Sequence, residues 1–128
     1  GGTLTGVGRF LRAKNPDVKL FAVEPSDSPL LSQGKAGPHK LQGIGANFVP
    51  DILDTKLCDR IVTVTTEEAY GAARELVSLE GILVGISAGA ALWAAIQAAT
   101  EPENDGRSIV VLLPDTGERY LSTVMFAE

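Results

Sequence analysis

The sequence predicts an α/β protein with three layers, in which helices cover both faces of a mostly parallel sheet. Short apolar segments alternate with amphipathic ones along the 128 residues, as strands alternate with helices in this class. Hydrophobic residues make up 45% of the chain, but aromatic residues make up only 5%. The core must therefore consist of Ala, Val, Leu and Ile, which suit buried parallel strands flanked by helices of small residues.

The first third of the chain is expected to contain two helical segments and one strand. Residues 4–14 carry apolar side chains at helical spacing, and Asn15-Pro16 stops that helix. Residues 19–23 form a short apolar run that ends at Glu24-Pro25, as a strand would. Residues 28–33 are predicted to make one or two helical turns.

The rest of the chain is expected to add three strands and three helices. Residues 60–65 alternate as a strand does, and Thr65 with Glu68 has the spacing of a capping box. The helix that begins there is expected to end at Gly81. The segments that follow are predicted to be a strand at 82–86, a helix at 88–100, a strand at 108–113 and a helix at 118–125.

Charge and composition exclude several classes of function. The net charge is −5 and the 11 basic residues are scattered, so no nucleic-acid partner is expected. Cys58 is the single cysteine, which excludes an internal disulfide and a zinc site built from cysteines, and we expect no metal. No apolar stretch approaches the roughly 20 residues that span a bilayer, and no signal peptide is visible. We therefore expect a cytoplasmic protein without a membrane partner.

Residues 37–50, with the sequence GPHKLQGIGANFVP, follow neither the helical period nor the alternation of a strand. Bulky apolar groups stand there beside His39 and Gln42, which carry polar ring and amide groups. A loop that is anchored in a core while it wraps around a polar ligand has this composition. An ordinary packed surface loop is the alternative.

Gly1-Gly2-Thr3 precedes the first predicted helix and resembles a phosphate cup. Glycines let amide groups approach an anion, a threonine hydroxyl adds a donor, and the helix dipole adds positive potential. The segment is not a dinucleotide fingerprint, because Thr3 stands where the second glycine belongs. Glu24 at a strand end, about twenty residues on, keeps a nicotinamide site as an alternative.

Gly85-Ile86-Ser87-Ala88-Gly89 matches the GxSxG pattern of a nucleophile elbow. A hydrolase triad of that fold needs a histidine after the serine, and the only histidine, His39, precedes it. A hydrolase is therefore disfavoured. The small residues would still let a flat ligand lie close to the backbone with the Ser87 hydroxyl aimed at it. Ser87 as a helix N-cap is the structural alternative.

Residues 114–120, Pro-Asp-Thr-Gly-Glu-Arg-Tyr, follow a predicted strand directly. Loops at the carboxyl ends of parallel strands form ligand sites in open α/β sheets. We expect Asp115 or Thr116 to act as a helix N-cap, a role that is preferred for Asp115 over a catalytic one, and Glu118 and Arg119 to form ion pairs.

Five segments, taken in order, carry a family resemblance: GGTLTGVGRFL, VEPSDSPL, GPHKLQGIGANFVP, EGILVGISAGAA and LLPDTGERYLST. They resemble the carboxyl-terminal half of the cysteine synthases, or O-acetylserine sulfhydrylases. That family belongs to the tryptophan-synthase-β-like, fold type II enzymes that use pyridoxal 5'-phosphate. The resemblance implies that residues 1–128 are most of the large carboxyl-terminal domain of a two-domain enzyme. The amino-terminal half, with its Schiff-base lysine, is absent from the chain.

The resemblance also implies roles for individual residues. Gly1, Gly2 and Thr3 match the loop that holds the cofactor phosphate, and Ser87 matches the serine that hydrogen-bonds the pyridine nitrogen. A serine does not force protonation of that nitrogen as an aspartate would, which favours β-elimination over transamination. The pair of residues that matches the loop on the substrate side of the cofactor is Gln42 and Gly43.

The family reaction converts O-acetylserine and sulfide into L-cysteine and acetate, by a homodimer that also binds the tail of serine acetyltransferase. No residue of this chain is assigned as catalytic, so the chain alone is expected to be inactive. Its lysines that match no family motif are Lys14, Lys19, Lys35, Lys40 and Lys56. Two alternatives remain: a cystathionine β-synthase, and a non-catalytic module that binds the acetyltransferase tail.

Overall fold

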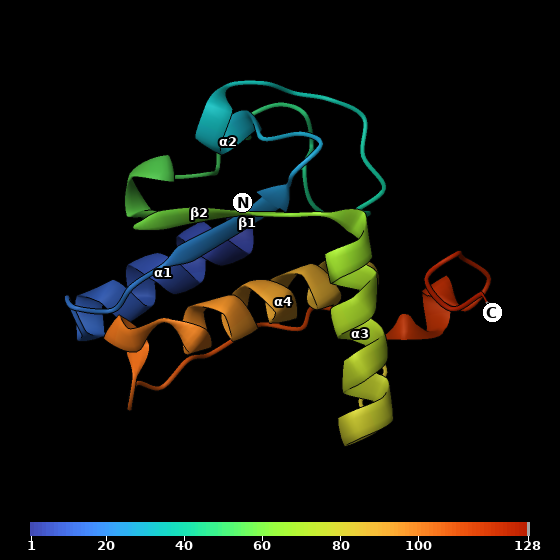
Figure 1. Cartoon of the computed structure of the whole chain (residues 1–128). Helices are drawn as coiled ribbons and strands as arrows, with labels where there is room; N and C mark the ends of the chain where they lie inside the picture. The colour runs from blue at the N-terminus through green and yellow to red at the C-terminus, as the bar shows by residue number, and fades with distance from the viewer. Residues whose placement is uncertain (128) are drawn as a thin grey trace.

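The computed structural model describes residues 1–127 and shows helices packed around a small sheet (Figure 1). The principal elements in chain order are α1 (Gly2–Lys14), β1 (Phe21–Pro25), α2 (Leu30–Gln33), β2 (Arg60–Val64), α3 (Thr66–Glu80) and α4 (Ile86–Thr100). The short 3₁₀ turns are η1 (Thr55–Leu57), η2 (Pro102–Asn104) and η3 (Gly117–Tyr120).

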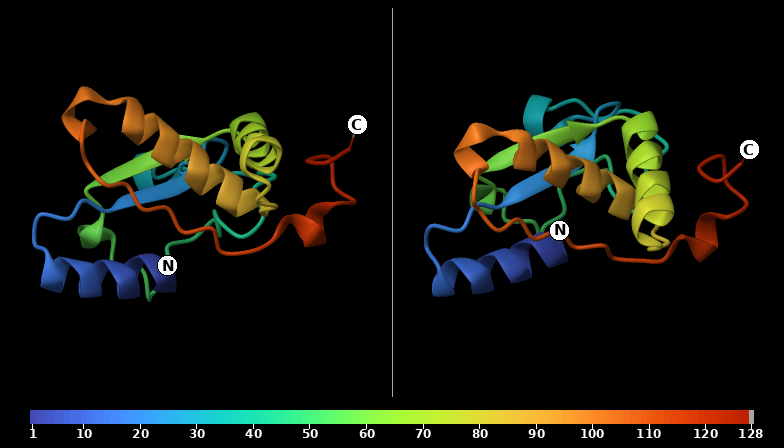
Figure 2. Two further views of the ribbon diagram at one scale, coloured as in Figure 1. Left: turned by 90° about the horizontal axis from the view of Figure 1, so that it is seen from below. Right: turned by 60° about the horizontal axis from the view of Figure 1, so that its bottom comes forward.

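The sheet is parallel, with β1 beside β2 in a register that pairs Phe21 with Arg60 and Pro25 with Val64. In the left view of Figure 2 the strands lie between α1 on one side and α4 on the other. Leu20, which precedes β1, packs closely under Gly8 of α1, 2.8 Å from where a Cβ would stand at Gly8. The α/β class with helices on both faces is therefore confirmed.

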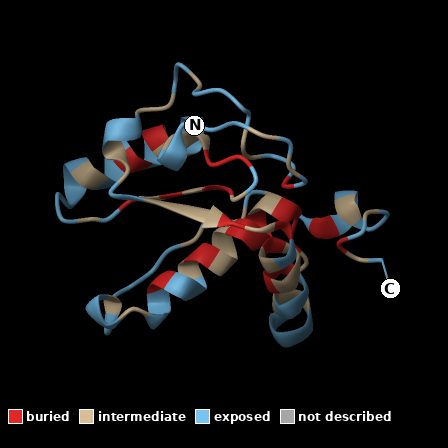
Figure 3. Ribbon diagram, turned by 45° about the horizontal axis from the view of Figure 1, so that its top comes forward, coloured by how far each residue is buried: buried red, intermediate tan, exposed pale blue. Residues whose placement is uncertain are grey.

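The core is concentrated where α3 and α4 meet β2, as the buried residues in Figure 3 show. The two helices approach so closely that a Cβ at Gly89 would collide with the carbonyl oxygen of Ala69. Small residues on both helices permit this approach, because close packing needs short side chains at the contact. The fully buried members of this core include Val64, Ala69, Ala73, Ala88 and Ala90.

The predicted capping box of α3 is confirmed. The Glu68 amide donates to the Thr65 hydroxyl at 3.2 Å, and the Thr65 amide donates to the Glu68 carboxylate at 2.8 Å. The helix ends at Gly81, whose φ of 69° lies in the left-handed region that favours glycine. Helices α1 and α4 also lie where the sequence predicts them, but each begins two residues earlier than predicted, at Gly2 and at Ile86.

Two strand predictions are wrong for this structure. In segment 82–86 only Val84 pairs, in an isolated antiparallel bridge with Thr116. Segment 108–113 is in no strand, and its Val110 is 92% exposed. A strand needs a neighbour to accept its hydrogen bonds, and the described residues offer none beside 108–113. The apolar composition of segments 82–86 and 108–113 predicted strands, but neither segment forms one within the described residues.

Two further boundaries differ from prediction. The first strand begins at Phe21 rather than at residue 19, because the Leu20 amide donates to the Asp59 carboxylate at 2.8 Å instead of joining the ladder. The predicted helix at 118–125 is only the turn η3, and the chain then continues in further turns. The Thr123 hydroxyl donates to the Tyr120 carbonyl at 2.6 Å, and such local side-chain bonds compete with helical ones.

Within residues 1–127, no helix is both long enough and apolar enough to cross a membrane.

Candidate functional site

The amino ends of α1 and α4 point the same way in Figures 1 and 2, toward the carboxyl ends of β1 and β2. Amide groups in the first turn of a helix lack helical partners and carry the positive end of the helix dipole. This edge of the sheet is where open α/β folds bind their ligands. Both predicted cofactor segments therefore lie at the amino end of a helix on that edge.

Gly1, Gly2 and Thr3 form the exposed start of α1. Gly1 is the N-cap without a side-chain hydrogen bond, and its carbonyl accepts from the Thr5 amide at 3.0 Å. A Cβ at Gly1 would stand 2.7 Å from the Cβ of Leu53, so only glycine fits against that neighbour. Within residues 1–127, the amides of Gly2 and Thr3 donate to no protein acceptor, which leaves them free to bind an anion.

The segment beside this helix start is held in place by Thr5. The buried Thr5 hydroxyl accepts a hydrogen bond from the Asp54 amide at 3.1 Å. Asp54 also accepts from Arg9 of α1 at 3.0 Å, and this hydrogen bond lowers the pKa of the Asp54 carboxyl. The Leu53 backbone is therefore fixed against the first turn of α1.

Ser87 and Gly43, predicted to face the cofactor and the substrate, lie side by side. Ser87 is half-buried in the first turn of α4, and Gly43 is an exposed loop residue. A Cβ built on Gly43 would stand 3.4 Å from the Ser87 Oγ. The φ of Gly43 is 94°, a value that side chains disfavour. Gln42 adjoins Gly43 and is exposed, and its backbone amide donates to the Lys40 carbonyl at 3.1 Å.

The structural alternative for Ser87 is wrong. The N-cap of α4 is Gly85, and no side chain caps this helix. Among the described residues the Ser87 hydroxyl has no hydrogen-bond partner, so it remains available to a ligand. The first amides of α4 face the same region and favour an electron-rich ligand atom there.

The loop 114–120 lies beneath this helix start. The Tyr120 hydroxyl donates to Asp115 Oδ2 at 2.6 Å, and this bond raises the pKa of the Tyr120 phenol. Asp115 Oδ1 is buried and has no partner among the described residues. A Cβ at Gly85 would collide with that same oxygen. Gly85 is thus required for Asp115 to approach the amino end of α4, a contact that sequence reasoning missed.

Of the two predicted N-cap candidates in that loop, Thr116 caps η3, with its hydroxyl accepting from the Glu118 amide at 3.4 Å, and Asp115 does not. The predicted ion pairs are wrong, because Glu118 and Arg119 form none within residues 1–127. Both are exposed, where an ion pair contributes little free energy to offset its loss of side-chain freedom.

Glu24 is engaged in structure rather than available to a ribose. It is 3% exposed, and its carboxylate accepts from the Leu31 amide at 2.8 Å and the Ser32 amide at 3.0 Å. These bonds satisfy the first amides of α2. The nicotinamide alternative therefore loses the residue on which it depended.

Metal and thiol chemistry find no support in the described residues. No group of three or more His, Cys, Asp or Glu side chains within residues 1–127 is arranged to hold a metal ion. Cys58 is half-buried before β2, and burial raises the pKa of its thiol, which makes the thiolate scarce.

These features fit a flat, anionic coenzyme. Free amides at the start of α1 suit a phosphate group, and an unpartnered hydroxyl beside a glycine suits the edge of an aromatic ring. The fold and site thus define an α/β protein that binds a phosphorylated coenzyme at the carboxyl edge of its sheet.

Residues 1–115 match the family described as pyridoxal-phosphate dependent enzyme. The chain belongs to that family, and pyridoxal phosphate is its cofactor, as the sequence predicts.

Relatives with assigned names agree with the resemblance. The chain is 50% identical over 136 aligned residues to cysteine synthase A of Salmonella typhi, covering 100% of this chain and 42% of that protein. A crystal structure of cysteine synthase from Entamoeba histolytica matches with a TM-score of 0.94 and 44% identity, over 97% of this chain and 37% of that one. The chain therefore spans about two-fifths of the length of the relatives it matches.

One solved relative is named as a different enzyme. The O-acetylserine dependent cystathionine beta-synthase of Helicobacter pylori matches with a TM-score of 0.87 and 38% identity, over 99% of this chain and 41% of that one. Its fold is shared with the cysteine synthases, so the fold alone does not decide between the two reactions.

Proposed function

We propose that the protein containing this chain makes L-cysteine from O-acetylserine and sulfide by pyridoxal-phosphate dependent β-replacement. The observation that carries the proposal is the placement of Gly43 directly against Ser87 at the amino end of α4. The Ser87 hydroxyl and the backbone of Gly43, which has no side chain, lie next to each other there. The cofactor ring and the substrate can both bind at this point. The named relatives support the choice of reaction.

The chain's own residues divide the binding of the cofactor. The amides of Gly1, Gly2 and Thr3, with the Thr3 hydroxyl, hold the phosphate at the positive end of α1. The Ser87 hydroxyl hydrogen-bonds the pyridine nitrogen. When bound, the cofactor supplies a conjugated ring that withdraws electrons from the substrate. A neutral hydroxyl partner leaves that withdrawal moderate, which favours loss of a β-substituent.

Gln42 and Gly43 line the substrate side. Because Gly43 has no side chain, an amino-acid substrate can approach the ring from the loop without steric conflict. The Gln42 amide can donate to and accept from polar groups of the substrate.

Residues 1–128 form, in this proposal, most of the large carboxyl-terminal domain of a two-domain enzyme. Their coverage of 42% of the Salmonella relative supports this assignment. The Schiff-base lysine and the grip on the substrate carboxylate belong to the other part of the protein. The chain by itself is then inactive, and none of its lysines takes the catalytic role.

The wider assignments belong to the same proposal. The protein acts as a cytoplasmic homodimer and binds the carboxyl-terminal tail of serine acetyltransferase in its active-site cleft. Similarity to whole cysteine synthases supports these assignments. A non-catalytic module that retains only tail binding is the alternative, and it predicts tail binding without cysteine formation.

The specific alternative is a cystathionine β-synthase, favoured by the Helicobacter pylori relative. The protein containing this chain is loaded with pyridoxal phosphate and supplied with O-acetylserine. Its initial rate with sulfide is then compared with its initial rate with homocysteine. We expect the rate with sulfide to be the larger. A faster reaction with homocysteine would select the alternative, and no reaction with either would refute β-replacement.

A further inference from the structure

Both ring nitrogens of His39 bond to the backbone of its own loop. The Leu41 amide donates to His39 Nδ1 at 3.1 Å, and His39 Nε2 lies 2.6 Å from the Gly45 carbonyl oxygen. We name His39, Leu41 and Gly45, with these two hydrogen bonds, the histidine clasp. His39 is the ring-bearing polar residue of loop 37–50, and it has no role in the proposed binding of cofactor or substrate.

The partners of the clasp fix the state of the ring. A carbonyl oxygen only accepts, so Nε2 must carry a hydrogen, and an amide only donates, so Nδ1 must be bare. The clasp therefore requires the neutral imidazole with its proton on Nε2. A second proton on Nδ1 would face the Leu41 N–H, and the bond between them would be lost.

The clasp is anchored in the core at both ends. The Leu41 side chain is 1% exposed and belongs to the core beside α4. Gly45 has a φ of 63°, and a Cβ there would stand 2.5 Å from His39 Nε2 and 2.6 Å from Cγ of Pro25. Glycine is thus required for the loop to close on the ring.

Gln42 and Gly43 lie inside the closed segment, between the two residues that the ring binds. We propose that His39 is a positioning residue, which through the clasp holds Gln42 and Gly43 against Ser87. The inference rests on the proposed function for the substrate role of this loop. The dependence of the Gly43–Ser87 contact on His39 does not need the proposed function, because it follows from the contacts within the chain.

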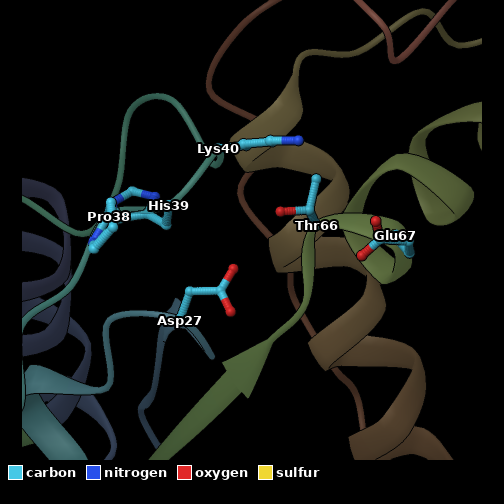
Figure 4. Close-up of a pocket in the computed structure, with 6 residues that line it drawn as sticks. All are labelled: Asp27, Pro38, His39, Lys40, Thr66 and Glu67. Atoms are coloured by element: carbon cyan, nitrogen blue, oxygen red, sulfur yellow. The ribbon is translucent and has the colours of Figure 1, made fainter.

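Charged groups face His39 across an open hollow of about 380 Å³ (Figure 4). His39 and Lys40 come from one wall, and Thr66 and Glu67 come from the amino end of α3 opposite them. Asp27, from the segment after β1, points its carboxylate into the space between. Two carboxylates and one ammonium therefore line the hollow beside the ring.

Nuclear magnetic resonance tests the clasp directly. The ring ¹⁵N shifts give the tautomer, and the proximity of a Gly43 α-proton to the Ser87 β-protons reports the contact. Both are recorded at pH 8 in the protein containing this chain, and the ring signals that disappear in the His39 variants are assigned to His39. The variants are His39→Asn, which keeps an acceptor for the Leu41 amide, and His39→Ala, which keeps neither bond. Lys40→Ala is the matched control, because Lys40 is exposed beside His39 and its ammonium bonds nothing within residues 1–127.

We expect the wild type to carry its ring proton on Nε2 and to show the Gly43–Ser87 proximity. His39→Asn should keep that proximity, since its side-chain oxygen can accept from the Leu41 amide. His39→Ala should lose it, and its Leu41 amide should exchange about fivefold faster. A proton on Nδ1 at pH 8, or a contact that survives in His39→Ala, would overturn the proposal. Lys40→Ala should behave as the wild type, and loss of the contact there would also overturn it.

The effect of the clasp on substrate binding is measured separately, by steady-state kinetics. We expect His39→Ala to raise KM for O-acetylserine about fivefold with a smaller change in kcat, and His39→Asn to restore most of the loss. If the contact is lost while KM is unchanged, the positioning role is refuted. If neither the wild type nor any variant forms cysteine, the proposed function is refuted, while the spectroscopic test of the clasp remains valid.

Discussion

Gly43 lies next to Ser87 at the candidate site: a Cβ at Gly43 would stand at van der Waals distance from Ser87, 3.4 Å from its Oγ and 3.5 Å from its Cβ. One residue belongs to the long loop after α2 and the other to the first turn of α4. The contact brings the predicted substrate loop to the predicted partner of the cofactor ring. The functional assignment depends on this pair.

Gly43→Ala is expected to destabilise the fold and weaken cofactor binding. The positive φ of 94° strains any side chain, by about 1–2 kcal/mol, and the added methyl, 3.4 Å from the Ser87 Oγ, would fill the space beside that hydroxyl. Urea unfolding measures the free energy, and titration with pyridoxal phosphate measures the affinity. Gly34→Ala is the matched control, because Gly34 has a φ of 70° and nothing within 4 Å of its Cβ position. Equal loss of cofactor affinity in both variants would show that strain alone, and not the Ser87 contact, is responsible.

Thr65→Ala is expected to lower the free energy of unfolding by about 1–2 kcal/mol. The variant removes the hydroxyl that accepts from the Glu68 amide and leaves one first-turn amide of α3 unsatisfied. Denaturant unfolding measures the loss. Ser78→Ala is the control, because Ser78 is exposed on the same helix and its hydroxyl makes no hydrogen bond within residues 1–127. A Thr65→Ala protein as stable as Ser78→Ala would contradict the role of the capping box.

The Asp115–Tyr120 bond predicts a late titration of Tyr120. The hydrogen bond to the carboxylate, and then burial, raises the pKa of this phenol above its ordinary value of about 10. A raised pKa in the folded state stabilises the fold below the unfolded pKa, and this contribution is lost as the pH rises through the folded pKa. Difference absorbance at alkaline pH, with Tyr120→Phe to assign the signal, gives the order of titration. In Asp115→Asn the Tyr120 titration should shift toward lower pH, and an unchanged titration would disprove the coupling.

Asp59 is expected to contribute to acid sensitivity. The Leu20 amide hydrogen bond, with Arg12 as a further cause, lowers the pKa of its carboxyl below the ordinary value of about 3.9. A lowered pKa stabilises the folded state above the unfolded pKa, and the contribution is lost as the pH falls through the folded pKa. Unfolding measured from pH 6 down to acid should therefore show a shallower loss of stability in Asp59→Asn. Parallel curves for the two proteins would refute this role.

The helices were predictable because their signals are local. Thr65, Glu68 and Gly81 specify both ends of α3 within one stretch of sequence, and the structure confirms each of them. The strands were only half predictable, since a strand depends on a neighbour elsewhere in the chain. Segment 108–113 has a strand's composition but no pairing partner within residues 1–127.

The site was predictable only in its residue types. Gly43 and Ser87 each match a motif, but their contact depends on a loop whose course sequence patterns do not give. The histidine clasp escaped prediction for the same reason, because its bonds require the positive φ of Gly45. Gly85 was predicted as part of a small-residue turn, while its contact with Asp115 arises from packing between distant segments.

The functional assignment requires the Ser87 hydroxyl to meet the pyridine nitrogen of the cofactor. The ¹⁵N shift of ring-labelled pyridoxal phosphate, bound to the protein containing this chain, measures the protonation of that nitrogen. We expect an unprotonated nitrogen in the wild type and a protonated one in Ser87→Asp, with Ser122→Ala unchanged from the wild type. A nitrogen shift that is the same in the wild type and in Ser87→Asp would contradict the assignment.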